Sequence, residues 1–316
     1  MKHVKLLAML MTAIAFTACI NDNEKEFAVD KTIRLSANIQ GQQTRATMAN
    51  SPNLQNTGFN NGAEINVYIQ DAENQGTWID GFSANGVTYT VNNSVLESAV
   101  EAKYPESNKV DVYAVYPKTV KIGDTRFDVG DGQYEEEGYI EKDLMVANKA
   151  NHNASDGTVR LTFKHMLSKV IVKILPGNTG IDVSTINDLC MDNIYTSIAI
   201  TQTMTGGLAL GDPQGSKTYI HVNSQNEIST DFENVGVASI IVPQTIPANT
   251  CLFDFGAGGM NFTYYTDSPI EFKSGCVHTI TLTLDNSNVT MGSFNITKWD
   301  DNASNNHSGN AIPDPY

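Results

Sequence analysis

Apolar and polar residues alternate along much of this chain, and the alternation starts near its N-terminus. An apolar residue at every second position predicts a strand with one buried face. The first such segment carries four apolar residues, Ile33, Leu35, Ala37 and Ile39. Helical stripes are scarce. Further strands are predicted at residues 65–69, 87–91, 110–116, 159–163, 167–174, 197–201, 219–222, 237–242, 252–255, 270–272, 277–284 and 293–299.

Turn-forming residues separate these strands, at residues 60–62, 130–132, 154–157, 176–178, 206–207 and 212–213. Many short strands divided by such turns favour β-sandwiches over a doubly wound parallel sheet. A chain of 316 residues has room for two domains. We therefore expect an all-β protein with two tandem β-sandwich domains, residues 46–157 and 158–316. The polar run 151–157 is the expected boundary, although the strand at 167–174 could be shared.

The first residues have the pattern of an export signal. Lys2, His3 and Lys5 precede an apolar run at residues 6–18. This run is too short to cross a hydrocarbon layer of ~30 Å as a helix, so it indicates a signal peptide that is removed, residues 1–18. The sequence Phe16-Thr17-Ala18-Cys19 resembles a bacterial lipobox, which implies cleavage before Cys19 and acylation of that residue. The alternative is an ordinary secretory signal with a chance cysteine.

Composition narrows the possible partners. With 41% hydrophobic and 17% charged residues, the chain can build real cores. Its formal net charge of −15 opposes binding to nucleic acid, because phosphates would repel it and no basic stripe interrupts the acidity. Beyond Cys19, the cysteines are Cys190, Cys251 and Cys276, far apart in sequence. Three buried thiols are the preferred interpretation, and one disulfide with one thiol is the alternative.

Thr44-Arg45-Ala46 follows the first predicted strand, within the polar stretch 41–57. A protease can reach an extended backbone in such a stretch. We expect cleavage between Arg45 and Ala46, which would make residues 19–45 a lipidated propeptide that contains the first strand. The alternative is that this tripeptide occurs there by chance.

Several segments together resemble one family, the Mfa-like fimbrillins, which are pilins of the type V pili of Bacteroidales. The similar segments are residues 110–117 (VDVYAVYP), 143–147 (DLMVA), 163–170 (FKHMLSKV), 241–245 (IVPQT), 273–275 (KSG) leading into 277–284, and 296–299 (ITKW). With the lipobox and Thr44-Arg45-Ala46 they cover nearly the whole chain in the order of the family.

The resemblance implies that the protein belongs to a surface fimbrium, and it implies how that fimbrium is assembled. It implies transthyretin-like domains, a palmitate-bearing precursor anchored in the outer membrane through Cys19, and cleavage after Arg45 by an arginine-specific surface protease. Other fimbrial subunits are the implied partners, through donor-strand exchange, and a host or bacterial surface ligand is possible for an adhesive subunit. The first strand, with Ile33, Leu35, Ala37 and Ile39, would then be displaced by a strand from another subunit.

The candidate donor strand lies near the C-terminus and carries Val289, Met291, Phe294 and Ile296. The spacing breaks step between Met291 and Phe294, which indicates a bulge, a turn or two short strands. The tail at residues 300–310 is polar and has no alternating face. This tail slightly favours a tip or minor subunit over a stalk subunit.

Catalytic and metal-binding patterns are poor, so we expect no enzyme, no cofactor and no metal. The six histidines show no metal-ligand spacing, and no His/Cys cluster occurs in sequence. His165 is interpreted as structural. Glu135-Glu136-Glu137 with Asp128 and Asp131 matches no calcium loop and is interpreted as a solvated acidic segment. Cys276 and His278 would share one face of a strand, with no evident third partner.

A rival function uses the same signal and fold. A surface-anchored lipoprotein that never polymerises could bind a glycan or a host protein. Trp78 and Trp299 are interpreted as core or edge anchors. Tyr104, Tyr113 and Tyr116 could contribute to a glycan platform if the fold brought them together.

Overall fold

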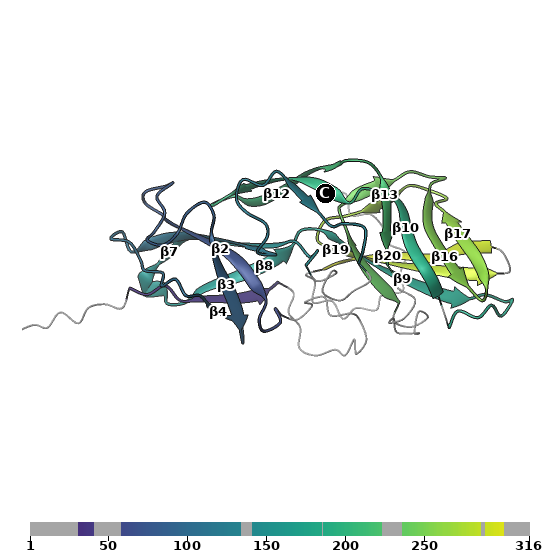
Figure 1. The fold of residues 1–316 in the computed structure, drawn as a ribbon, viewed down its shortest axis with the longest axis horizontal. Coiled ribbons are helices and arrows are strands. Elements are labelled where there is room, and N and C mark those ends of the chain that lie inside the picture. Colours follow the sequence, from purple (N-terminus) through teal and green to yellow (C-terminus); the bar gives the residue numbers. More distant parts are fainter. Residues whose placement is uncertain are drawn as a thin grey trace, which may run out of the picture. The chain divides into compact units, whose positions relative to one another are not determined.

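The computed structural model describes residues 31–40, 58–133, 141–184, 186–222, 236–285 and 288–299. The chain separates into two units, residues 1–30 and 31–316, and every described residue belongs to the second. Cys19, Arg45, Ala46 and the tail after Trp299 lie outside the described residues. Those residues are built from strands, with one short 3-10 helix, η1 (Ala154–Asp156), which confirms the all-β class (Figure 1). No helix among them has the length and apolar character needed to cross a membrane.

The N-terminal strands form one closed sheet. Its order is β1 (Leu35–Ile39), β4 (Val95–Glu97), β3 (Val87–Asn92), β2 (Glu64–Asp71), β5 (Lys109–Tyr116), β7 (Met145–Asn153) and β8 (Val159–His165). Alternation is clearest in β3 and β8, where every second side chain enters a shared core. Since β8 pairs with β1 and β7, this sheet extends beyond residue 157. The division into domains at that residue stays a prediction.

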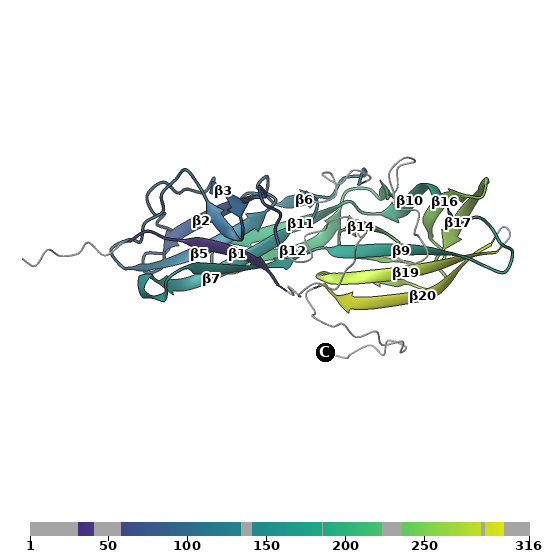
Figure 2. The same ribbon diagram turned by 90° about the horizontal axis from the view of Figure 1, so that it is seen from below.

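Two four-stranded sheets dominate the C-terminal part, and their apolar residues share a second core. One has the order β14 (Val237–Ile241), β9 (Ser168–Pro176), β19 (Cys276–Asp285) and β20 (Asn288–Lys298). In Figure 2, β9, β19 and β20 run side by side. The other has the order β13 (Thr218–His221), β10 (Ile186–Ile194), β16 (Cys251–Ala257) and β17 (Met260–Tyr265).

Smaller sheets complete the described fold. One joins β12 (Gly207–Gln214), β11 (Ser197–Thr203) and β6 (Arg126–Asp128). The other joins β15 (Gln244–Ile246) and β18 (Ile270–Phe272). Because β6 precedes β7 in sequence but pairs with β11, strand pairing does not follow chain order.

Among the described residues, the outer edge of β14 is hydrogen-bonded by the side chain of Gln133 and not by another strand. Gln133 Nε2 donates a hydrogen bond of 2.6 Å to the Ile240 carbonyl, and the Ile240 N–H donates one of 2.8 Å to Gln133 Oε1. The Ser239 hydroxyl also donates to Gln133 Oε1, at 3.0 Å. One buried amide therefore satisfies backbone groups that would otherwise be unpaired.

His278 is fully buried in β19, and its ring lies against the rings of Phe272 and Phe294. Its Nε2 accepts a hydrogen bond of 3.0 Å from the Lys273 N–H, so the neutral imidazole fits the site. Burial lowers the pKa of His278 to about 4, from an ordinary value of 6.5.

We expect the protein to lose stability as the pH falls from about 6.5 to about 4, because the unfolded chain protonates His278 in this window and the folded chain does not. The shift corresponds to roughly 3 kcal/mol of unfolding free energy. Urea unfolding across this pH range measures it. His278→Gln should be less stable at neutral pH but lose less on acidification. An equal loss in both proteins would show that other groups cause the pH dependence.

Candidate functional site: the first and last strands

Strand β1 closes the N-terminal sheet. It runs parallel to β8, with Leu35 opposite Val159 and Ile39 opposite Phe163, and antiparallel to β4. The Ala37 N–H donates to the Ser94 carbonyl at 2.9 Å, and the Gln40 N–H donates to the Phe163 carbonyl at 2.8 Å. Both edges of β1 are therefore hydrogen-bonded.

The apolar face predicted for this segment is buried. Each of its four apolar residues is at most 5% exposed and lies in the N-terminal core: Ile33, Leu35, Ala37 and Ile39. Burial of three large aliphatic side chains contributes roughly 5–9 kcal/mol before ordering costs. If β1 left, the edges of β4 and β8 would lose a partner and an apolar groove would open between them. The displacement itself stays a prediction.

Residues on both sides of the connection between β1 and β2 contact Phe163. Gln40, the last described residue before the connection, bonds to the Phe163 carbonyl. Phe59, just after it, packs edge-on against the Phe163 ring at 4.9 Å and against Tyr116 at 5.5 Å. Sequence reasoning missed Phe59, because a lone aromatic in a polar stretch shows no period. Phe59, which lies after the expected cleavage point, therefore contacts rings on β5 and β8.

Strand β20 is an edge strand that pairs only with β19 among the described strands. Thr281 lies opposite Ser293 and Leu282 opposite Met291, so Gly292 is an extra residue and the predicted break in step is a bulge. Three of the candidate donor residues are half-buried against the C-terminal core: Val289, Met291 and Phe294. Ile296 is 36% exposed. Whether this strand is donated stays a prediction.

The end of β20 is held by a buried polar cluster. The Trp299 ring stacks on His165, with centroids 4.0 Å apart and an interplanar angle of 3°, and Lys169 Nζ lies 5.9 Å from the Trp299 centroid. His165 Nδ1 lies 2.9 Å from Asp143 Oδ1, and the backbone N–H of Trp299 donates to the Gly275 carbonyl at 2.7 Å. His165 is thus a structural histidine and Trp299 an edge anchor, as predicted.

Lys169 belongs to this cluster and was not identified from the sequence. Its side chain is buried, and this burial lowers the pKa of Lys169 to about 8, which the negative charge of Asp143 partly offsets. The ammonium group of Lys169 lies over the Trp299 ring, where a cation–π contact is favourable. Alternation alone would not find it, because the residue interrupts an apolar run.

The remaining candidates take structural positions. Tyr104, Tyr113 and Tyr116 are all buried, so they form no exposed glycan platform. Trp78 is half-buried against core residues. Asp128 is paired with Arg126, and residues 135–137 lie outside the described part. Within the described residues, no group of three or more acidic, His or Cys side chains is arranged to hold a metal ion.

The cysteines partly match expectation. Cys190, Cys251 and Cys276 form no disulfide, as preferred. All three are half-buried instead of buried.

Comparison with known proteins identifies the family. The model of the fimbrillin-like family matches residues 44–299, so this chain is a member of that family. A candidate cell adhesion protein from Bacteroides uniformis has a similar fold, with a TM-score of 0.61 and 17% identity over 85% of this chain and 100% of the other. One from Bacteroides ovatus has a TM-score of 0.60 and 17% identity over 85% and 98% of the two chains. No curated protein matches the chain.

Ala37→Asp should destabilise the protein by about 3 kcal/mol or more, because it places a carboxylate in the apolar core beneath β1. Ser36→Asp is the matched control: it adds the same charge on the other face, opposite Arg160, and should change stability by less than about 1 kcal/mol. Urea unfolding of both variants measures the difference. Similar effects at the two positions would contradict the one-sided burial of β1.

Trp299→Ala should reduce the unfolding free energy by about 2 kcal/mol, because it removes the ring stacked on His165. Amide hydrogen exchange should then speed up at the Lys298 end of β20. Trp299→Phe retains a ring and should keep most of the protection. If exchange along β20 were unchanged in Trp299→Ala, the cluster would not hold this strand.

Proposed function

We propose that this protein is a subunit of a surface fimbria, exported as a lipoprotein, cut after Arg45 and assembled by strand donation. The fimbrillin-like family and its fimbrial or adhesive character support a structural role at the cell surface rather than catalysis. The two transthyretin-like sandwich domains implied by the resemblance belong to the same proposal.

The observation that carries the proposal is the position of β1. It closes the N-terminal sheet, with both edges bonded and its apolar face buried, so it protects the groove until it leaves. Cleavage after Arg45 would cut the connection between β1 and β2. The new N-terminal segment would still be anchored by Phe59 on Phe163. A strand of another subunit could then pair with β4 and β8, with backbone hydrogen bonds for affinity and alternate side chains for register.

The strand from another subunit would pack against the apolar, core-facing side chains of β8. On β8, Val159, Leu161 and Phe163 face the core at alternate positions, opposite the side chains that β1 now supplies. A donor therefore needs apolar residues at every second position to replace those of β1. A shift by one residue would turn polar side chains into the core.

The last strand supports a tip or minor subunit over a stalk subunit. Strand β20 already has a place in its own sheet, and Trp299 fixes its end. A donor strand of a stalk subunit would have to leave that place or be supplied by the tail. The polar character of residues 300–310 does not favour the tail as an apolar donor.

The test is an Arg45→Ala variant, compared with wild type and with Arg34→Lys as a control, each recovered from the surface of the native cell. Wild type and the control should begin at Ala46 without lipid and form polymer ladders. Arg45→Ala should remain a folded, acylated precursor that contains β1 and should fail to enter a polymer. N-terminal sequencing, intact mass and gel electrophoresis measure these outcomes.

Two results would contradict the proposal. Ladders of wild-type intensity from Arg45→Ala would show that cleavage is not needed for assembly. A wild-type protein that starts at acylated Cys19 and keeps β1 would favour the rival function, a permanently anchored lipoprotein that binds a glycan or a host protein.

A further inference from the structure

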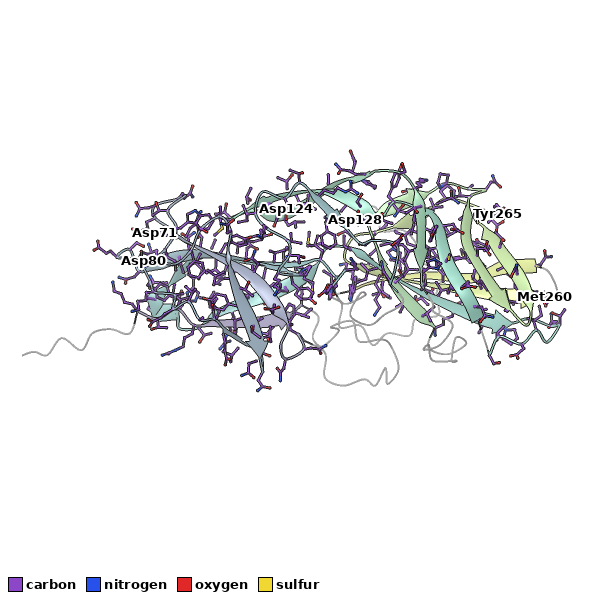
Figure 3. All side chains as sticks on the ribbon, in the orientation of Figure 1. Asp71, Asp80, Asp124, Asp128, Met260 and Tyr265 are labelled. Carbon is purple, nitrogen blue, oxygen red and sulfur yellow. The ribbon has the colours of Figure 1, made fainter. Side chains whose placement is uncertain are left out.

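A polar pocket of about 650 Å³ lies on the sheet formed by β13, β10, β16 and β17. Its lining includes a thiol, an imidazole and three carboxylates, from Cys190, His221, Asp188, Asp192 and Asp254. No Lys or Arg contributes to the lining. Figure 3 marks Met260, which also lines the pocket, at one end of β17 and Tyr265 at the other. The pocket is therefore rich in carboxylates and in metal-binding side chains, and no Lys or Arg side chain balances its negative charge.

Strand register places three of these residues side by side. Cys190 on β10 lies directly opposite His221 on β13 and directly opposite Asp254 on β16. Directly paired residues on neighbouring strands have Cβ atoms about 5 Å apart and share one face of the sheet. The neighbours of Cys190 on β10, Leu189 and Met191, are fully buried, so Cys190 points away from the core.

The thiol and the imidazole are already in contact. Cys190 Sγ lies 3.2 Å from His221 Nδ1. Zinc bonds of about 2.3 Å to sulfur and 2.0 Å to nitrogen place the two atoms roughly 3.5 Å apart in a tetrahedral site. The observed separation is within a few tenths of an ångström of that value.

A second thiol and carboxylate extend the cluster. Asp192 follows Cys190 by two positions on β10 and faces the same way, and the Cys251 thiol donates to Asp192 Oδ2 at 3.7 Å. Burial, reinforced by the nearby carboxylates, raises the pKa of both Cys190 and Cys251 to about 11. Both thiols are therefore poor nucleophiles, which argues against a catalytic cysteine.

We propose that this pocket binds a soft divalent cation such as Zn²⁺, with Cys190 and His221 as its first ligands and the carboxylates of Asp254 and Asp192 as further ligands. Thiolate and imidazole select such an ion over Ca²⁺ or Mg²⁺, which prefer oxygen. On binding, the Cys190 proton leaves to solvent and the metal takes its place on the sulfur. No three donors converge in the described residues as they stand, so the carboxylates must turn toward the Cys190–His221 pair.

Titration of the full-length protein with Co²⁺ tests this proposal, because a cobalt–thiolate bond gives a charge-transfer band in the near ultraviolet. One equivalent should produce the band, and Zn²⁺ should displace the cobalt. Cys190→Ser should abolish the band. His221→Ala should weaken cobalt binding at least about tenfold, and Asp254→Asn should weaken it less.

Cys276→Ser is the matched control, since Cys276 lies on β19 outside the pocket lining, and its titration should equal that of wild type. Circular dichroism of the metal-free variants checks that each is folded. The proposal is overturned if wild type gives no thiolate band, or if the band persists in Cys190→Ser. Loss of the band in Cys276→Ser alone would place the metal at another cysteine and would overturn it equally.

Discussion

The parallel pairing of β1 with β8 is the interaction on which the N-terminal sheet depends. It joins residues more than a hundred positions apart in sequence, with Leu35 opposite Val159, and it converts an open sheet with two edges into a closed one. An open sheet would present unpaired backbone groups on β4 and β8 beside an apolar groove, a surface that readily accepts another strand. The core between β1 and β8 is therefore also the place where one strand could be exchanged for another.

The first and last strands are held in different ways. Strand β1 is bonded on both edges and buries an entire apolar face, so its departure would require loss of a large hydrophobic contribution in one step. Strand β20 is bonded on one edge, is half exposed, and is fixed at its end by Trp299 on His165. An edge strand that is hydrogen-bonded on one side only can loosen locally without opening its core. Removal of β1 therefore calls for an event outside equilibrium fluctuation, such as cleavage of the connection to β2 followed by competition from another strand.

Much of the fold followed from the alternation of apolar residues, and its failures have physical causes. The face of β1 and the bulge in β20 were readable because side-chain direction in a strand depends only on local spacing. The strand β4 was missed because its three residues are too few to show a period. The strand β10 was missed because its register shifts against both neighbouring strands. The role of His165 was predicted, but its partners Asp143 and Trp299 come from separate segments of the chain. Strand register, which decides such contacts, is set by the whole sheet and not by any one segment.

The same reason explains why a search for metal-ligand spacing in sequence found nothing, although Cys190 and His221 are in contact. Their separation of 31 residues fits no short motif, and only the pairing of β10 with β13 places them opposite each other. The pocket lies on strands that include neither β1 nor β20, and its ligands come from β10, β13 and β16. A cation bound there would tie three neighbouring strands together across one face. It would therefore stabilise the sheet β13-β10-β16-β17 without contributing to the contacts that hold β1 in its groove.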